Sequence, residues 1–377
     1  MDFLFIADPL NSFAIQKDST LAMMRAAQAA GHSLWFVETR GIVWKNNSVV
    51  ADCRPLVIKP SSASWFEVGA IEPRRVADFS AVLMRKDPPF DIEYLNTTWL
   101  LSAAVRQGAR VFSQPGAIRE NSEKLSIVEY PDLIPPTLVT RDLAEVEAFH
   151  AMHRDIVIKP LDGMGGMGVF RVGSDGLNLA SIVETLGENG ARTLMVQRFL
   201  PEIAQGDKRV LLIAGEVVPY ALARIPQGKE IRGNLAAGGK GVAMPLTPQE
   251  MKVAQYLAPL LWQKGLFLVG LDLIDGYLTE INVTSPTCFV EITSKSFSSV
   301  VKAHAALRRS VRMSFKGFSA KVGSAKIMLW TSKNAAISCG ASFGNPPRRV
   351  VNSDWTCLKA ACNRSASASS CPGSIKW

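Results

Sequence analysis

Short apolar runs alternate with a helical segment at the start of the chain. Residues 3–7 (Phe-Leu-Phe-Ile-Ala) form a continuous apolar run that predicts a buried strand. Residues 20–30 follow a helical pattern that stops at Gly31, and residues 33–37 again predict a strand. This order of strand, helix and strand predicts an α/β opening domain.

A glycine-rich loop lies between two runs that predict strands in the middle of the chain. Residues 156–160 are apolar apart from Lys159, and residues 169–172 are β-branched and aromatic. The glycines of residues 163–168 formally match G-x-G-x-x-G, but that motif requires a following helix, and the Gly-Lys-Ser/Thr of a P-loop is absent. We therefore predict a hairpin tip whose backbone N–H groups approach phosphates, with Lys159 as a point charge. An ordinary mobile hairpin is the alternative.

Two carboxylates and an amide occur in a second predicted hairpin. Residues 268–274 form an apolar run that contains Asp272, and the turn pair at residues 275–276 leads into another strand. In a hairpin Asp272 can face Glu280 and Asn282, which share one face because they are two residues apart. These oxygen ligands suit Mg²⁺ that bridges to phosphates. Solvated charges on a strand face are the alternative, which the apolar surroundings of Asp272 disfavour.

Six stretches, in order along the chain, resemble the prokaryotic glutathione synthetases of the ATP-grasp superfamily. They are residues 84–91, 159–166, 206–210, 223–228, 232–239 and 279–287. The resemblance extends over residues 1–291 and is more specific than any single glycine motif. It implies an α/β ATP-grasp fold that follows an N-terminal α/β domain.

The resemblance also implies a reaction. ATP would phosphorylate the cysteinyl carboxylate of γ-L-glutamyl-L-cysteine, and the amine of glycine would attack the acyl phosphate to give glutathione, ADP and phosphate. Mg²⁺, or Mn²⁺, and lysine side chains would offset the charge of the moving phosphoryl group. Another ATP-grasp carboxylate–amine ligase is the alternative within this class.

Roles for single residues follow from the same resemblance. The metal would be held by Asp272, Glu280 and Asn282. Residues implied in ATP binding are Lys124, Lys159, Gly165, Gly166, Gln197, Phe199, Leu200 and Asp207, with the backbone of Phe199 and Leu200 at the adenine edge and Asp207 on the ribose side. Residues implied in catalysis and substrate binding are Arg209, Arg224 and Arg232, whose planar guanidinium groups match carboxylates, together with the substrate-binding Ser285, Pro286 and Thr287. A glycine-rich lid at residues 225–240 would protect the acyl phosphate from water.

We expect three lobes and a tail, with a homotetramer implied by the resemblance. Residues 1–118 would form the N-terminal α/β domain, residues 119–190 the lid subdomain with the glycine-rich loop, and residues 191–291 the metal and substrate subdomain. The sequence shows neither a signal peptide nor an apolar run of about 18 residues, so we expect a cytoplasmic protein and no membrane partner.

The net charge of +9 is unevenly distributed. Residues 292–377 hold 14 Lys and Arg and one acidic residue, a charge of +13, whereas residues 1–291 hold 28 basic and 32 acidic residues, a charge of −4. The basic character therefore belongs to the tail, and the body is mildly acidic.

The tail differs from the pattern of the family. It contains four of the six cysteines and no glutamate, and its cysteine spacings fit no familiar zinc site. Our hypothesis is that residues 292–377 are translated out of frame or are a recently acquired extension. A basic arm that binds nucleic acid is the alternative from another functional class, and its scattered aromatic residues do not favour it.

Overall fold

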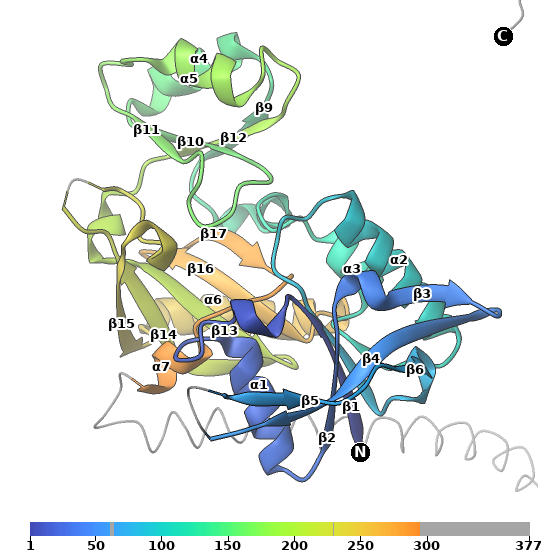
Figure 1. Ribbon diagram of the computed structural model, residues 1–377. Coiled ribbons are helices and arrows are strands. Elements are labelled where there is room, and N and C mark those ends of the chain that lie inside the picture. The colour runs from blue at the N-terminus through green and yellow to red at the C-terminus, as the bar shows by residue number, and fades with distance from the viewer. Residues whose placement is uncertain (61–63, 229, 295–377) are drawn as a thin grey trace, which may run out of the picture. The chain divides into compact units, whose positions relative to one another are not determined.

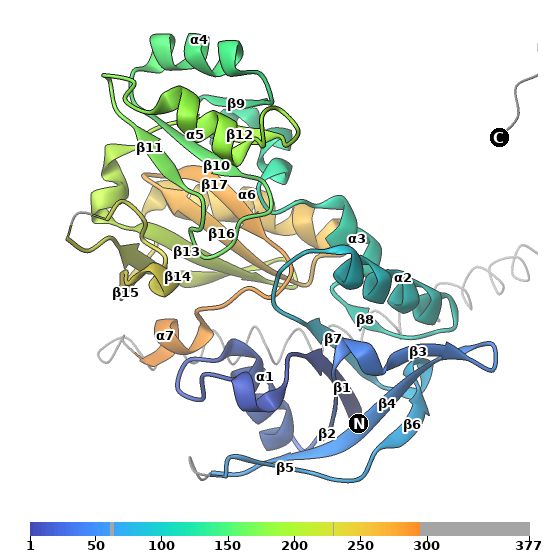
Figure 2. The same ribbon diagram turned by 45° about the horizontal axis from the view of Figure 1, so that its top comes forward.

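The computed structural model describes residues 1–60, 64–228 and 230–294, which form three β-sheets with helices packed against them (Figures 1 and 2). The first sheet holds β1 (Asp2–Ala7), β2 (Ser33–Val37), β3 (Ile42–Lys45), β4 (Ser48–Ile58), β5 (Phe66–Val68), β6 (Glu72–Arg75), β7 (Ala81–Arg85) and β8 (Val111–Phe112). The second holds β9 (Thr137–Thr140), β10 (Ile156–Pro160), β11 (Phe170–Val172) and β12 (Leu194–Arg198). The third holds β13 (Asp207–Ile213), β14 (Glu216–Ile225), β15 (Lys240–Pro245), β16 (Leu268–Ile274) and β17 (Tyr277–Asn282). The predicted α/β class is confirmed.

Alternating side chains of β1 supply two cores on the two faces of the first sheet. β1 pairs in parallel with β2 and β7. Phe3 and Phe5 pack with residues of α1 (Ser19–Ala29), whereas Leu4 and Ile6 pack with residues of α2 (Ile92–Arg106). The expected strand, helix and strand at the start of the chain are thus confirmed.

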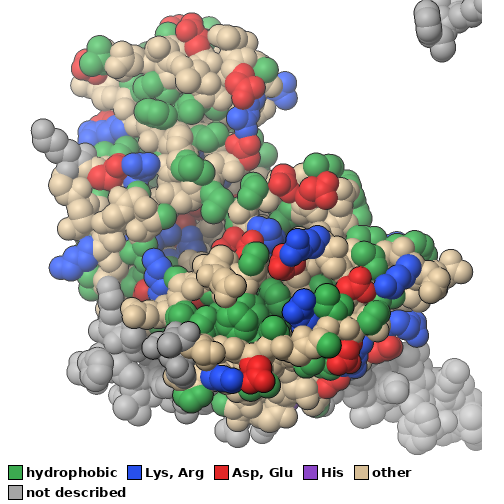
Figure 3. Space-filling view, in the orientation of Figure 1, with side chains coloured by type: hydrophobic (Ala, Val, Ile, Leu, Met, Phe, Trp, Pro, Cys, Tyr) green, Lys and Arg blue, Asp and Glu red, His purple; other side chains and the backbone are tan. Residues whose placement is uncertain are grey.

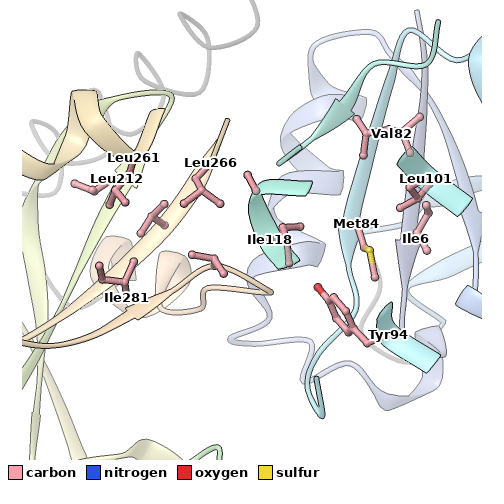
Figure 4. Packing of buried hydrophobic residues seen from close by; sticks show 14 of the residues in the cluster. Ile6, Val82, Met84, Tyr94, Leu101, Ile118, Leu212, Leu261, Leu266 and Ile281 are labelled. Carbon is pink, nitrogen blue, oxygen red and sulfur yellow. The ribbon is translucent and has the colours of Figure 1, made fainter. Parts of the chain in front are cut away.

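The core that contains Ile6 also reaches the third sheet. Figure 4 shows Ile118, from α3 (Pro115–Glu120), between a group of side chains near Ile6 and another near Ile281. All belong to one cluster of buried residues. This continuous packing is the apolar support on which the site residues rest.

The second sheet contains the predicted glycine hairpin. β10 and β11 pair antiparallel, and the glycine-rich loop joins them. One face of this sheet is covered by α4 (Leu143–His153) and α5 (Leu179–Leu186) (Figure 2). β12 lies beyond the predicted subdomain boundary at residue 190, yet it pairs with both β9 and β10. The four-stranded sheet therefore extends to Arg198, because β12 is one of its two inner strands and its first three residues are buried.

The third sheet is antiparallel throughout, in the order β15-β14-β13-β16-β17. α6 (Pro248–Gln263) covers one face, with Val253, Leu257 and Leu261 buried in the same core as Leu271. α7 (Phe289–Ser294) contacts β14 and β15. The opposite face of the sheet carries the polar residues described below.

Within the described ranges no helix is both long enough and apolar enough to cross a membrane. The hypotheses on the basic tail concern residues that, beyond Ser294, lie outside the described part of the chain. On the face shown in Figure 3, basic and acidic side chains are interspersed. This agrees with the nearly equal numbers of basic and acidic residues in residues 1–291.

A capping box fixes the start of α6. The side chain of Thr247 accepts a hydrogen bond from the N–H of Glu250, and the Glu250 carboxylate accepts one from the N–H of Thr247. We expect Thr247→Ala to lower the free energy of unfolding by about 0.5–2 kcal/mol. Urea denaturation followed by circular dichroism measures it. Thr247→Ser keeps the hydroxyl and serves as the control; equal losses in both variants would contradict a capping role.

Candidate functional site

The register of the third sheet gathers charged residues on the face opposite α6. Arg209 pairs with Asp272, and Asp272 pairs with Glu280 across the hairpin that the sequence predicted. On the other side Asp207, two residues before Arg209, pairs with Arg224. Paired residues on neighbouring strands point to the same face, as do residues two apart on one strand. The alternation of the sheet therefore places all five on one surface.

Asp272 is the centre of this group and is 2 % exposed. Its Oδ1 accepts a hydrogen bond from Arg209 Nε, while Oδ2 accepts from Arg209 Nη2 at 2.9 Å, Arg224 Nη2 at 2.9 Å and Asn282 Nδ2 at 3.2 Å. Three of these four donors meet at Oδ2, so the carboxylate is enclosed mainly from that side. Burial alone would raise the pKa of Asp272, but the charges of Arg209 and Arg224 outweigh it and hold the pKa below its ordinary value.

Asp207 is bound to the same arginine system. One oxygen pairs with Arg224 Nη2, and Oδ1 is buried without a hydrogen-bond partner among the described residues. Burial raises the pKa of Asp207 to about 7, against the lowering effect of Arg224 and with the repulsion of Asp272 added. The sequence had placed Asp207 on the ribose side of the nucleotide; the structure places its carboxylate beside Arg224.

Gly270 makes room for the arginine that binds Asp272. A Cβ atom at this position would lie 2.8 Å from Cδ and 3.2 Å from Nε of Arg209. These atoms belong to a side chain that is held at its far end by two hydrogen bonds. No pattern in the sequence indicated this role, because a glycine within a predicted strand indicates only a close approach of unknown kind.

Two buried lysines lie beside the glycine-rich loop. Lys124 Nζ contacts Glu280 Oε1 at 3.0 Å and the carbonyl of Gly163. Lys159, near the end of β10, donates from Nζ to the carbonyl of Thr279 at 3.3 Å. Burial lowers the pKa of Lys159 to about 8, although Glu280 counteracts it. The two predicted phosphate-binding lysines thus converge on the strand that carries Glu280.

The segment that joins β14 to β15 meets the glycine-rich loop. Arg232 Nη1 donates to the carbonyl of Gly166 at 3.2 Å, and a Cβ at Gly166 would lie 2.6 Å from Asn234 Oδ1. Gly165 and Gly166 have φ values of 62° and 86°, which favour glycine. Arg232 also pairs with Glu230 at 2.5 Å. The described parts of the predicted lid are therefore in contact with the loop that they would close over.

The predicted adenine hinge follows β12. Gln197 is buried, and its Nε2 donates to Thr137 Oγ1 at 3.0 Å. The guanidinium of Arg171 lies 3.9 Å from the ring centroid of Phe199. The N–H of Phe199 already donates to the carbonyl of Asp155 at 2.9 Å. Because this N–H already has an acceptor, only the carbonyl of Phe199 remains for the expected contact with the adenine edge.

The predicted substrate segment follows β17 and is held by the N-terminal domain. Ser285 Oγ contacts Asp87 Oδ1 at 2.5 Å, and the carbonyl of Pro286 accepts a hydrogen bond from Arg85 Nη2 at 2.9 Å. Arg85 is buried and also donates to Thr20 Oγ1. Arg85 and Asp87 belong to a stretch that carried the family resemblance, but no role had been assigned to either.

One cavity of about 370 Å³ is lined by every residue that the sequence proposed for the site. This volume lies within the usual range of small-molecule sites. From the second sheet and its loop come Lys159, Gly165, Gly166, Gln197, Phe199 and Leu200; from the third sheet and its connections come Asp207, Arg209, Arg224, Arg232, Asp272, Glu280, Asn282, Ser285, Pro286 and Thr287; Lys124 completes the set. Residues that the sequence reasoning missed include Glu123 and Asp87.

The chain matches two family models that together cover nearly all of its described part. "Prokaryotic glutathione synthetase, N-terminal domain" matches residues 1–119, and "Prokaryotic glutathione synthetase, ATP-grasp domain" matches residues 123–296. The glutathione synthetase of Ralstonia nicotianae is 53 % identical over 296 residues, which cover 78 % of this chain and 91 % of that protein. That of Shewanella oneidensis is 47 % identical over 287 residues, which cover 76 % and 91 %.

Solved structures of ATP-grasp enzymes share the fold. The D-cycloserine synthetase DcsG aligns with a TM-score of 0.56 at 17 % identity, over 82 % of this chain and 99 % of that one. The ATP-grasp ligase PsnB with a minimal precursor aligns with a TM-score of 0.54 at 18 % identity, over 83 % and 98 %. At these identities the likeness establishes the ATP-grasp fold.

The space at Gly270 provides a test of the Arg209–Asp272 contact. We expect Gly270→Ala to displace Arg209 and to lower ATP turnover by about tenfold or more, because the loss of one charged hydrogen bond corresponds to about 1.5–3 kcal/mol. Gly116→Ala is the matched control, since a Cβ there meets only Arg119 Nη2, at 3.8 Å. Equal turnover in both variants would show that Arg209 adjusts without consequence.

Proposed function

The chain belongs to the prokaryotic glutathione synthetase family and is an ATP-dependent enzyme of glutathione synthesis, and we propose that it joins γ-L-glutamyl-L-cysteine to glycine through an acyl phosphate. The observation that carries this proposal is the convergence of two buried lysines and three arginines on one cavity that also contains Asp272 and Glu280. Such a site can hold several anionic groups together while water is kept away.

Activation of a carboxylate requires a leaving group and the containment of negative charge. Phosphorylation of the cysteinyl carboxylate supplies the leaving group. Lys124 and Lys159 lie beside the glycine-rich loop, and we propose that they bind the phosphates of ATP and offset charge as the phosphoryl group moves. A nearby phosphate would favour the charged form of Lys159, whose pKa burial lowers to about 8. The chemistry needs no side-chain nucleophile.

We propose that Arg209, Arg224 and Arg232 bind the substrate carboxylates or the acyl phosphate. Arg209 and Arg224 are buried at the centre of the face, and Arg232 reaches it from the segment after β14. Guanidinium groups bind carboxylates and phosphates through paired N–H donors. The contact of the lid segment with the glycine-rich loop supports the exclusion of water from the acyl phosphate.

A divalent metal ion is expected for the family, and the residues present fit one. Asp272, Glu280 and Asn282 offer hard oxygen ligands on one face of a hairpin. We propose that they hold Mg²⁺, with Mn²⁺ as a substitute. When bound, the cation supplies positive charge to the phosphate oxygens of ATP. Since Asp272 accepts from four donors and Glu280 from Lys124, at least one of these contacts must be given up for the cation.

Domain limits, assembly and location are proposed on the family resemblance. We retain residues 1–118 as the N-terminal domain and place the division within the ATP-grasp region after Arg198, where the second sheet ends. A homotetramer and a cytoplasmic location complete the proposal. The free thiols of Cys53 and Cys288 are compatible with a reducing compartment.

Isotope transfer tests the acyl phosphate. With Mg-ATP, glycine and γ-glutamylcysteine labelled with ¹⁸O in the cysteinyl carboxylate, we expect phosphate release that requires all three substrates and carries one ¹⁸O atom. Lys159→Ala should lose this turnover and stay folded, whereas Lys252→Ala, at an exposed position on α6, should keep it. Release of unlabelled phosphate would contradict the proposed acyl-phosphate intermediate. Release of phosphate without γ-glutamylcysteine would contradict the proposal that this dipeptide is the substrate.

The metal assignment is tested at Glu280. Glu280→Gln keeps the shape of the side chain and removes its charge, so we expect the Mg²⁺ concentration for half-maximal activity to rise by about tenfold or more, about 1.4 kcal/mol. Glu216→Gln, at an exposed position on β14, is the control. An unchanged Mg²⁺ dependence in Glu280→Gln would exclude Glu280 as a ligand.

A further inference from the structure

Glu123 binds the end of β17 in place of a neighbouring strand. It lies in the connection after α3, next to Lys124. Its backbone carbonyl accepts a hydrogen bond from the N–H of Ile281 at 2.9 Å. Its Oε1 accepts three more, from the N–H of Val283 at 2.9 Å, the N–H of Thr284 at 3.0 Å and Thr284 Oγ1 at 2.9 Å. One residue thus accepts four hydrogen bonds from residues 281–284, at an edge where the described part of the chain adds no further strand to the sheet.

The backbone that Glu123 fixes leads directly into the segment Ser285 to Thr287. That segment is held from its other side by Asp87, through the Ser285 hydroxyl, and by Arg85, through the carbonyl of Pro286. Glu123, Asp87 and the segment all line the cavity. Two separate parts of the chain therefore determine where this wall of the cavity lies.

We propose that Glu123 is a positioning residue that sets the affinity of the enzyme for γ-glutamylcysteine or glycine. Its carboxylate holds the backbone of residues 283–284, and through it the wall formed by residues 285–287. This inference rests on the proposed assignment of Ser285, Pro286 and Thr287 to substrate binding. It separates two neighbouring roles: Lys124 contacts Glu280 and the glycine-rich loop, whereas Glu123 contacts the backbone that leads into the substrate segment.

The geometry requires an acceptor oxygen rather than a charge. All three side-chain bonds go to a single oxygen, and the Oε1 of glutamine can accept them as well. Glu280 lies near enough to repel the Glu123 carboxylate, so the neutral amide also relieves this repulsion. Glutamine at this position should therefore preserve the wall, whereas alanine leaves buried N–H groups without a partner, which is costly.

Kinetics on the full chain test the proposal. We expect Glu123→Ala to raise the KM for γ-glutamylcysteine or glycine by about tenfold or more, because buried N–H groups lose their acceptor. The KM for ATP should stay within about threefold of wild type. Glu123→Gln should restore both KM values. Glu120→Ala removes an exposed carboxylate three residues earlier and is the matched control. Unchanged KM values for both γ-glutamylcysteine and glycine in Glu123→Ala, or an equal rise in the KM for ATP, would overturn the proposal.

Amide hydrogen exchange supplies a readout that does not depend on turnover. Val283 and Thr284 should exchange faster in Glu123→Ala and as in wild type in Glu123→Gln. Equal exchange in all three proteins would overturn the positioning role even if the reaction proved to be different, whereas a failure of wild type to use γ-glutamylcysteine would count against the proposed function alone. If Glu123→Ala does not fold, Thr284→Val removes only the hydroxyl bond. It should raise the same KM by a smaller factor, and an unchanged KM would overturn the proposal.

Discussion

The site depends on one buried carboxylate. Asp272 sits within an apolar strand, where an ionised group is tolerated only if it is fully paired. Arg209 and Arg224 provide that pairing, and both are buried themselves. Asp272, Arg209 and Arg224 therefore stabilise one another, and removal of any one of them would leave a buried charge uncompensated. The rest of the cavity is built around this arrangement, since the proposed metal ligands and the substrate arginines share it.

Side chains along the strands of the third sheet alternate between its two faces, so that one face forms the core and the other lines the cavity. Leu271 and Leu273 point into the core beneath α6, and Asp272, on the opposite face, lines the cavity. The other face is packed against α6, whose start is capped, and this packing supports the ionic face. Strands hold side chains more precisely than loops do, which suits a reaction that depends on the placement of several charges.

Local patterns in the sequence predicted much of this arrangement. The hairpins at the glycine-rich loop and at the turn after Asp272 follow from strand periodicity and turn residues, and the facing of Asp272 and Glu280 follows from the hairpin. Local patterns cannot show contacts between distant segments. Glu123 meets Thr284, 161 residues later, and its surroundings have no periodicity that would indicate a role. The use of the Phe199 N–H by Asp155 is likewise a contact between separate strands and loops.

Gly270 places a limit on how this protein can be stabilised. Replacement of glycine within a strand is a common route to a more stable enzyme, because it reduces the freedom of the unfolded chain. At this position the missing side chain is the space in which Arg209 lies. A programme of thermostabilisation that replaces glycines would therefore have to leave this one unchanged, because displacement of Arg209 would leave the buried charge of Asp272 uncompensated.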